Sequence, residues 1–386
     1  MVGQGAAMNM QMMAQSLLVY RVTGSATALG IMALANAVPM LVFSLFGGVL
    51  ADRLKKKHIF IVGQAMSAIL ALGVGLALAS GYVRTGNPES FWVLALAAGV
   101  QGMLMGFIAP ARQAFVVEVV GPERAMNAIS IGMLEMNTLR LIAPAAAGFL
   151  VDGLGFQAIY FAMAAMYVLA AVAVIPVQVA VVVQSARQKT LQSMIDGLQY
   201  VRRESTLMLV LVVTFFSILL SMPYMNLLPI FTEDVLDVGA SGMGMLLSVS
   251  GIGAIVCSLI LASLPNKKRG LMMMAGLLVL GVALAGFSFS TWWYASLALM
   301  VFVGFGQTAR MSLANTLLNY YVDPNYRGRV MSLQMMEFGL TSFGTFAAAL
   351  VAGAIGVQWA IGGLAVVLVV MSLGVLAFVP AMRRLD

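Results

Sequence analysis

Long apolar stretches dominate the chain, and only short polar segments separate them. Twelve such stretches are present, at residues 2–21, 27–51, 58–80, 91–112, 126–151, 157–181, 206–231, 239–264, 270–290, 292–319, 330–355 and 357–380. A bilayer core requires about 20 apolar residues per helix, and lipid offers no hydrogen-bond partner to a free backbone group. Each stretch is therefore predicted to be a transmembrane α-helix.

The first stretch is short. It has no Lys or Arg before it, and twenty residues of helix reach only about 30 Å at 1.5 Å per residue. We expect either a helix that barely crosses the bilayer or a true start upstream of Met1.

Composition agrees with this pattern. Of the 386 residues, 62% are hydrophobic and 9% are charged, whereas soluble domains carry roughly 25% charged residues. Soluble and disordered classes are excluded, since disorder needs low hydrophobicity and high charge. The lone Cys257 and the lone His58 exclude a disulfide framework and a Cys/His metal site. We expect no metal and no cofactor.

The basic residues indicate the orientation. If twelve spans alternate across the membrane, most of the 21 Lys and Arg residues fall on one side, for example at 55–57, 202–203 and 267–269. The other side retains only Arg21 and Arg84 among loop residues. The positive-inside rule then places both termini in the cytoplasm. Because the placement of these charges sets the topology, the net charge of +7 need not mean a nucleic-acid partner, and we expect none.

The two halves of the chain repeat each other weakly. Matched residues 202 positions apart include the pairs Gly102 and Gly304, Pro122 and Pro324, and Glu135 and Glu337. We predict an all-α membrane protein with twelve transmembrane helices in two pseudo-symmetric six-helix bundles, at 1–181 and 206–386. Between them, apolar positions at helical spacing in 182–205 predict a short amphipathic helix on the cytoplasmic face. The alternative for this linker is a plain tether.

The strongest motif lies between the second and third spans and reads Gly-Val-Leu-Ala-Asp-Arg-Leu-Lys-Lys-Lys, from Gly48 to Lys57. It resembles the G-x-L-A-D-R-x-x-R-K signature of the major facilitator superfamily. The resemblance implies a latch that closes the cytoplasmic side, with Asp52 approaching residues 328–332 at the start of the eleventh helix. The alternative is an anchor that only sets topology. The residues assigned to the gate are Gly48, Asp52, Arg53, Lys57, Arg327 and Arg329.

Two further segments, 18–25 and 323–332, resemble the bacterial exporter branch of this superfamily that includes enterobactin exporters and macrolide-efflux proteins. The resemblance implies a monomeric secondary transporter of the bacterial inner membrane. Its partners would be protons and a small amphipathic molecule of the drug or siderophore type, exported by alternating access. The chain departs from many proton-linked antiporters, because Ala98 stands where they carry an Arg. Only Pro144 and Gly148 match part of their helix-five signature.

Four ionisable residues fall inside predicted spans: Glu135, Arg140, Arg310 and Glu337. Such groups are costly in a bilayer and are functional candidates. We hypothesise that one or both glutamates carry a coupling proton, while the arginines tune them or hold an anionic substrate. The alternative is that both carboxylates lie close enough to the cytoplasm to reach water or to form structural pairs.

Polar residues on spans that are able to line a central cavity are candidates for substrate contact. They are Asn9, Gln11, Gln15, Asn137, Tyr224, Asn226 and Gln307. Methionine is abundant, with 31 residues, and Met8, Met10, Met12 and Met13 crowd the first span; such side chains suit a site that accepts several apolar shapes. The alternative is that methionine simply fills apolar helices. No nucleophile–base set or nucleotide loop is present, which argues against an enzyme.

Two other functions remain open at this level. One is an uptake permease of the same fold, because the direction of transport cannot be read from these motifs. The other is a non-transporting membrane protein or a chain truncated at its start, which the short first span favours.

Overall fold

The computed structural model describes residues 2–177, 190–264, 267–323 and 326–385. Within these residues the chain forms helices joined by short turns, without strands. By its internal contacts the chain divides into two compact units. The first contains residues 1–187 and 238–248, and the second contains residues 188–237 and 249–386.

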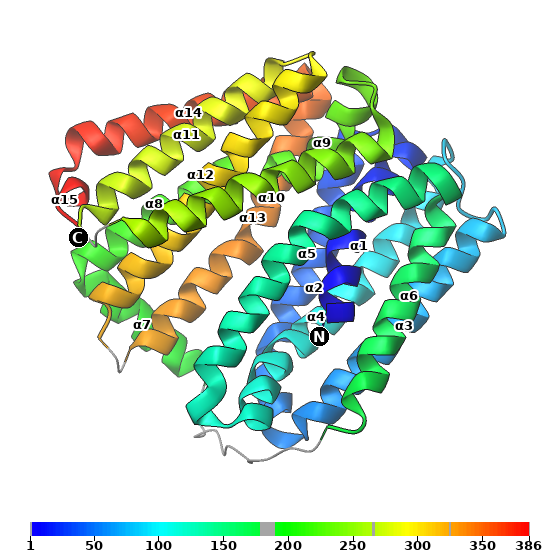
Figure 1. The fold of residues 1–386 in the computed structure, drawn as a ribbon, viewed down its shortest axis with the longest axis horizontal. Coiled ribbons are helices and arrows are strands. Elements are labelled where there is room, and N and C mark those ends of the chain that lie inside the picture. Colours follow the sequence, from blue (N-terminus) through cyan, green and yellow to red (C-terminus); the bar gives the residue numbers. More distant parts are fainter. Residues whose placement is uncertain (1, 178–189, 265–266, 324–325, 386) are drawn as a thin grey trace. The chain divides into compact units, whose positions relative to one another are not determined.

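The first unit is built around six long helices (Figure 1). They are α1 (Val2–Thr23), α2 (Ala26–Arg53), α3 (Lys56–Ala79), α4 (Phe91–Val120), α5 (Ala125–Leu154) and α6 (Phe156–Val174), with short 3₁₀ turns η1 (Pro88–Ser90) and η2 (Pro122–Arg124) before α4 and α5. Helix α2 packs against α4, α3 packs against both α4 and α6, and α1 packs against α5 and α6. Side chains of α3, α4 and α6 form one apolar core cluster around Phe60 and Ile108.

The second unit begins with a short helix and continues with the remaining spans. Its elements are α7 (Thr190–Arg203), α8 (Ser205–Ser221), α9 (Pro223–Ile230), the π-helical turn η3 (Phe231–Val235), α10 (Gly239–Ser263), α11 (Arg269–Phe289), α12 (Trp293–Tyr321), α13 (Arg327–Ile355), α14 (Val357–Phe378) and α15 (Pro380–Arg383). The first ten residues of α10 group with the first unit and the rest with the second. Helix α11 packs against α12 and α14, as α3 packs against α4 and α6.

Each of the twelve predicted spans coincides with helix in the described residues. Ten helical segments there are long and apolar enough to cross a membrane. Helix α1, which carries several amide side chains, is not among them. In α13 only the shorter segment Gly339–Ile355 is strongly apolar. The all-α membrane fold predicted from the pattern is confirmed, while several boundaries shift.

The largest shifts have local causes. Helix α4 runs on to Val120 and ends where Gly121 adopts a φ of +78° and donates its N–H to the Val117 carbonyl. The prediction ended this span at residue 112, because apolar content falls there. Backbone hydrogen bonding continues past the apolar stretch until a glycine terminates it.

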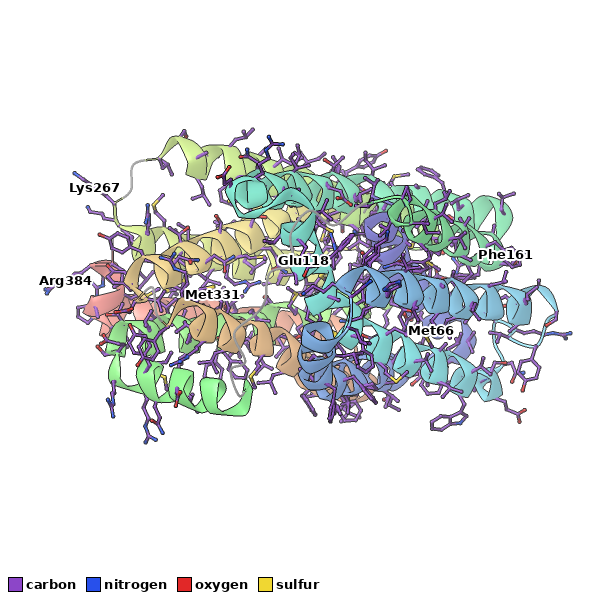
Figure 2. The ribbon with its side chains drawn as sticks, turned by 90° about the horizontal axis from the view of Figure 1, so that it is seen from below. Met66, Glu118, Phe161, Lys267, Met331 and Arg384 are labelled. Carbon is purple, nitrogen blue, oxygen red and sulfur yellow. The ribbon has the colours of Figure 1, made fainter. Side chains whose placement is uncertain are left out.

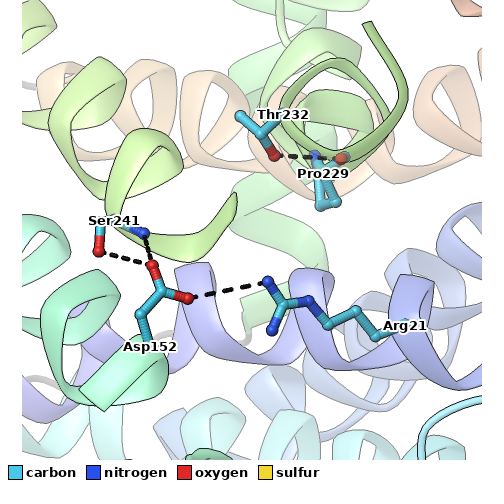
Figure 3. Close-up of polar contacts among 5 residues, drawn as sticks. All are labelled: Arg21, Asp152, Pro229, Thr232 and Ser241. Atoms are coloured by element: carbon cyan, nitrogen blue, oxygen red, sulfur yellow. Dashed lines mark hydrogen bonds and ion pairs between the residues drawn. The ribbon is translucent and has the colours of Figure 1, made fainter. Parts of the chain in front are cut away.

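The seventh span is interrupted. The helical run is broken at Met222, Pro223 begins α9, and Pro229 lies within α9 just before η3. Proline lacks an N–H, so nearby carbonyls lose their usual donors. The buried Thr232 hydroxyl donates to the carbonyls of Leu228 and Pro229 at 3.3 and 3.1 Å, and Figure 3 shows the bond to Pro229. The hydroxyl thus gives these two carbonyls a side-chain donor where α9 passes into the π-helical turn η3.

Glycines allow the helices within each unit to approach closely. A Cβ atom at Gly102 of α4 would collide with the carbonyl oxygen of Asn36 in α2. One at Gly304 of α12 would collide with that of Ser250 in α10. These glycines are the pair matched in the sequence repeat, so the α2–α4 contact of the first unit corresponds to the α10–α12 contact of the second. Small residues serve this purpose in membranes, where lipid supplies little hydrophobic drive between helices.

The outer helices present apolar side chains to their surroundings. Exposed large apolar residues include Met66 and Ile69 on α3, Leu169 on α6, and Val370 on α14; Met66 is labelled in Figure 2. A surface of this kind is suited to acyl chains and not to water. In the second unit the basic residues Lys267 and Arg384 lie at one end (Figure 2).

We predict that Gly304→Ala lowers the thermal stability of the purified protein. The added methyl forces α10 and α12 apart, and overpacking of this kind costs about 1–3 kcal/mol. Gly363→Ala on α14 is the matched control, because nothing lies within 4 Å of a Cβ there. Alanine favours a helix by up to about 1 kcal/mol over glycine, so the control should unfold at the same or a higher temperature in detergent. Equal melting temperatures for the two variants would contradict this packing argument.

Candidate functional site

A buried charged cluster lies inside the second unit. Arg310 on α12 and Glu337 on α13 are 1% and 6% exposed. The Arg310 guanidinium donates to Gln307 Oε1 at 3.0 Å, one turn earlier on the same helix. Glu337 Oε2 has no hydrogen-bond partner, although the Arg310 charge acts on this carboxyl group electrostatically. The sequence marked all three residues as candidates, and the fold brings them together.

The first unit contains a partly comparable acid. Glu135 on α5 is half-buried, and its Oε1 atom is buried without a hydrogen-bond partner. This oxygen lies against α1, where a Cβ at Gly5 would be 3.2 Å from it. Arg140 is half-buried on the same helix. Each unit therefore holds one glutamate of the repeat pair with a buried, unbonded carboxyl oxygen.

The lysines of the loop motif bind within their own unit. Lys56 pairs with the buried Glu118 of α4. Lys57 donates to the carbonyls of Ile175 and Val177 at 2.6 and 2.9 Å, just beyond the end of α6. A cation at a helix C-terminus satisfies carbonyls that lack partners within the helix. These contacts tie α3 to α4 and α6. Gly48, Asp52 and Arg53 are helical in α2, but their surroundings lie outside what the structure describes.

The start of α13 is held by the linker helix α7. Arg329 lies 3.7 Å from the Asp196 carboxylate and 5.0 Å over the ring of Tyr326. Tyr326 in turn stacks on Tyr200 of α7, with ring centroids 4.1 Å apart. The backbone N–H of Asp323 donates to the Tyr200 hydroxyl at 3.1 Å. The helix predicted in the linker is therefore docked on protein. Arg327 donates to the Asn319 carbonyl at the end of α12.

Helix α7 reaches α13 through a small buried residue. Gly197 is buried, and a Cβ there would lie 2.9 Å from the Arg329 Cβ. Val201 faces inward at 1% exposure, whereas Leu198 is 56% exposed. Of the four apolar positions that predicted an amphipathic face, 194 and 195 have side chains outside the described part of the structure. The helix is present, and its ends at Thr190 and Arg203 fall inside the predicted linker.

In the first unit, a polar contact joins the end of α5 to the start of α10. Asp152 Oδ2 accepts hydrogen bonds from the Ser241 N–H and hydroxyl at 2.7 and 2.6 Å (Figure 3). Arg21 at the end of α1 lies 3.9 Å from Asp152 and 5.5 Å over the ring of Phe156. Asp152 therefore caps a helix N-terminus that belongs to another element. No pattern in the sequence indicates this pairing, because the two residues lie 89 positions apart.

Packing between α5 and α10 is close beside that cap. A Cβ at Gly148 would collide with the Ala240 carbonyl, and one at Gly244 would collide with the Pro144 carbonyl. Pro144 and Gly148 are the residues that match the helix-five signature. In this chain they lie at the α5–α10 contact.

The candidate substrate residues divide by environment. In the first unit, Asn9 donates to the Gly5 carbonyl of its own helix. Gln11 accepts from the Tyr167 hydroxyl at 2.9 Å and lies 3.5 Å from Gln15. Asn137 is exposed on α5.

In the second unit, Tyr224 is buried, Asn226 is half-buried, and Gln307 lies against Met222 and Arg310. Among the described residues no group of three or more His, Cys, Asp and Glu side chains is arranged to hold a metal ion. Among the residues that the structure describes, the buried polar side chains include carboxylates, amides, hydroxyls and the Arg310 guanidinium.

Comparisons with known proteins agree with this architecture. The Major Facilitator Superfamily model matches residues 1–336 and 210–385. The staphyloferrin A transporter of Staphylococcus aureus is 25% identical over 338 residues, covering 86% of this chain and 83% of that protein. Macrolide efflux protein A of Streptococcus pyogenes is 24% identical over 347 residues, covering 87% and 83% of the two chains.

Solved structures show the same fold at low identity. The nucleoside transporter NupG superimposes with a TM-score of 0.75 at 12% identity, over 97% of each chain. A bacterial homologue of the human lysosomal transporter Spinster, in an inward-facing and unoccupied conformation, gives a TM-score of 0.70 at 13% identity, over 99% and 97%. The chain therefore belongs to the Major Facilitator Superfamily and is a multi-pass membrane transporter rather than an enzyme.

Proposed function

We propose that this protein is a proton-coupled exporter of small amphipathic organic molecules in the bacterial inner membrane. The relatives named for macrolide efflux and staphyloferrin A transport support substrates of the drug or siderophore class. The protein would act as a monomer, with both termini in the cytoplasm. Residues 1–181 and 206–386 would form the two bundles that alternate access, joined by the 182–205 linker.

One observation carries the proton-coupling part of this proposal. Glu337 is buried in a transmembrane bundle, with one carboxyl oxygen lacking a hydrogen-bond partner and with Arg310 acting on its charge. A buried carboxyl group without partners is stable when protonated, and a nearby arginine favours the ionised form. The balance between these effects changes when water reaches the site. A group that takes up and releases a proton during transport requires such a change in the balance between its protonated and ionised forms.

Glu135 would be the second proton-carrying candidate, in the first unit. Its unbonded oxygen faces α1 beside Gly5, so movement of α1 relative to α5 would alter its access to water. Arg140 and Arg310 would bias the two carboxylates or hold an anionic part of the substrate. Asn137, Asn226, Tyr224, Gln307 and the amides of α1 would supply polar contacts to the transported molecule.

The motif from Gly48 to Lys57 would control the cytoplasmic side. In this proposal Asp52 and Arg53 act in the latch, together with Arg327 and Arg329 at the start of α13. Arg329 already pairs with Asp196 of α7, so closing the latch would require the linker helix to share or release this arginine. The linker would then set how readily the gate closes.

The Asp152–Ser241 cap would act at the ends of the helices that lie opposite to the cytoplasmic motif. A carboxylate that holds the first turn of α10 against α5 stabilises the closed arrangement of that end. Transport by alternating access would require this cap to open and re-form.

We predict that Glu337→Gln abolishes proton-driven transport. Glutamine keeps the size of the side chain but cannot exchange a proton. Uptake of a radiolabelled macrolide, and separately of staphyloferrin A, into inside-out-oriented proteoliposomes under an imposed pH gradient should fall by roughly tenfold or more. Exchange of substrate across the membrane without a gradient should persist, because exchange needs no net proton movement. Glu135→Gln is tested in the same way.

The matched control is Glu123→Gln, which removes an exposed carboxylate between α4 and α5. It should transport like the unmodified protein. Full gradient-driven flux in both Glu337→Gln and Glu135→Gln would refute the coupling role. Flux only in the opposite direction would support an uptake permease, and no flux with any substrate would support a non-transporting protein.

We predict that Asp152→Ala exposes the first turn of α10. Loss of a helix cap costs about 0.5–2 kcal/mol, so amide hydrogen exchange at residues 240–243 should accelerate by roughly tenfold. Ser241→Ala removes only one of the two hydrogen bonds and should have a smaller effect. Glu89→Ala, at an exposed carboxylate before α4, should change nothing at α10. Unchanged exchange in Asp152→Ala would exclude the cap as a stabilising contact.

We predict that Asp196→Asn loosens α7 from α13. An exposed ion pair contributes about 0.2–1 kcal/mol, so hydrogen exchange in residues 196–203 should rise by a few-fold. Arg329→Gln should do the same, and the double variant should be no worse than either single one. The exchanged pair Asp196→Arg with Arg329→Asp should recover much of the protection. Fully additive effects would mean that these residues do not act through one contact.

A further inference from the structure

A small polar cavity lies inside the first unit, away from the buried glutamates. It is enclosed by α1, α2, α3, α4 and α6, with apolar walls from residues such as Met32, Leu94 and Met163. Its polar lining is supplied by Gln11, Gln15, Ser67, Gln101, Tyr160 and Tyr167. All of these residues belong to one unit, so the cavity is a feature of that unit alone.

Two of the polar side chains in the cavity wall lack partners in the protein. Ser67 on α3 and Gln101 on α4 are 1% and 4% exposed, and neither Ser67 Oγ nor Gln101 Nε2 makes a hydrogen bond within the chain. Leaving such a group unsatisfied costs about 1–3 kcal/mol. By contrast, Tyr167 and Gln11 in the same wall bond to each other at 2.9 Å. The cavity therefore presents a donor and a hydroxyl group to whatever occupies it.

The size and charge of the cavity restrict the occupant. The cavity volume is about 20 Å³, and a single water molecule needs at least roughly 10–15 Å³. Any organic substrate is far too large. No ionised side chain lines the cavity, so a bare ion would have no charge to offset its desolvation. The cavity therefore fits a neutral ligand of the size of one water molecule that both donates and accepts hydrogen bonds.

We propose that this cavity is a binding site for a single buried water molecule that bonds to Ser67 Oγ and Gln101 Nε2. Water satisfies both groups, because it accepts from the amide and exchanges a hydrogen bond with the hydroxyl. Buried waters of this kind make about three hydrogen bonds on average, and Gln15 or Tyr160 in the same lining is suited to supply the third.

The site has a consequence for the first unit. Helices α1 and α6 are joined by the Tyr167–Gln11 hydrogen bond, whereas α3 and α4 offer Ser67 and Gln101 from the other side of the cavity. The water joins these two pairs of helices through polar bonds in a region otherwise packed by apolar side chains.

Hydroxyl-radical footprinting by a brief X-ray pulse tests this proposal on the unmodified protein in detergent. Radicals form from water at the site where it is bound, so buried residues beside a bound water are oxidised faster than equally buried residues without one. Met163 and Tyr167 line the cavity and are each 1% exposed. Met300 and Tyr224, at 0% and 1% exposure, lie outside the cavity lining and serve as internal controls. We expect several-fold faster oxidation of Met163 and Tyr167.

Ser67→Val is the companion variant, because it removes the hydroxyl and fills part of the cavity. Oxidation of Met163 and Tyr167 should then fall to the rate of Met300 and Tyr224, while the melting temperature shows whether the fold is retained. Equal oxidation of the two residue pairs in the unmodified protein would overturn the proposal. So would faster oxidation of Met163 that persists unchanged in a folded Ser67→Val variant, since radicals would then arrive from elsewhere.

Discussion

The absence of water from the bilayer core is the constraint on which this structure depends. Every backbone N–H and carbonyl there must be bonded within the protein, which makes each apolar stretch a helix. The same constraint explains the local repairs. Thr232 bonds to carbonyls near two prolines, and Lys57 bonds to carbonyls just beyond α6. Both side chains supply hydrogen bonds to backbone carbonyls at the ends of helical segments.

Because lipid is as apolar as the helices, burial alone does not hold the helices together. Close backbone approach takes its place, through glycines such as Gly102 and Gly304. This packing is demanding, since one extra methyl group meets a carbonyl oxygen. It is also what the two halves of the chain share most clearly. The Gly102 and Gly304 pair of the repeat thus lies at a close helix contact in both halves.

Against this apolar background, the few buried polar groups acquire separate tasks. Glu118 is paired with Lys56 and so is structural. Glu337 has a buried oxygen with no hydrogen-bond partner and a neighbouring arginine, and for this reason we propose it as the coupling group. Ser67 and Gln101 face a cavity of water size and are neutral. The distinction between structure, coupling and hydration rests on which partner each group has, rather than on residue type.

Polar contacts at the helix ends complete this arrangement. Asp152 caps α10 at one place, and Asp196 holds Arg329 at another. Both are partly exposed, so each contributes modestly and is able to break and re-form at low cost. Contacts of that strength suit elements that move in the proposed transport cycle, whereas the close glycine contacts of α2 with α4 and of α10 with α12 suit elements that move together.

The sequence by itself determined the class, the number of spans and the repeat, because hydrophobic length and periodicity are local properties of the chain. It also singled out Glu135, Glu337 and Arg310, since an ionisable residue in an apolar stretch is conspicuous. Tertiary structure alone decided the partners. The Asp152–Ser241 cap, the Asp196–Arg329 pair and the Ser67–Gln101 cavity join residues far apart in the chain, and their pairing depends on helix rotation to within one residue. Apolar periodicity does not fix that rotation here, since many helices are apolar on every face.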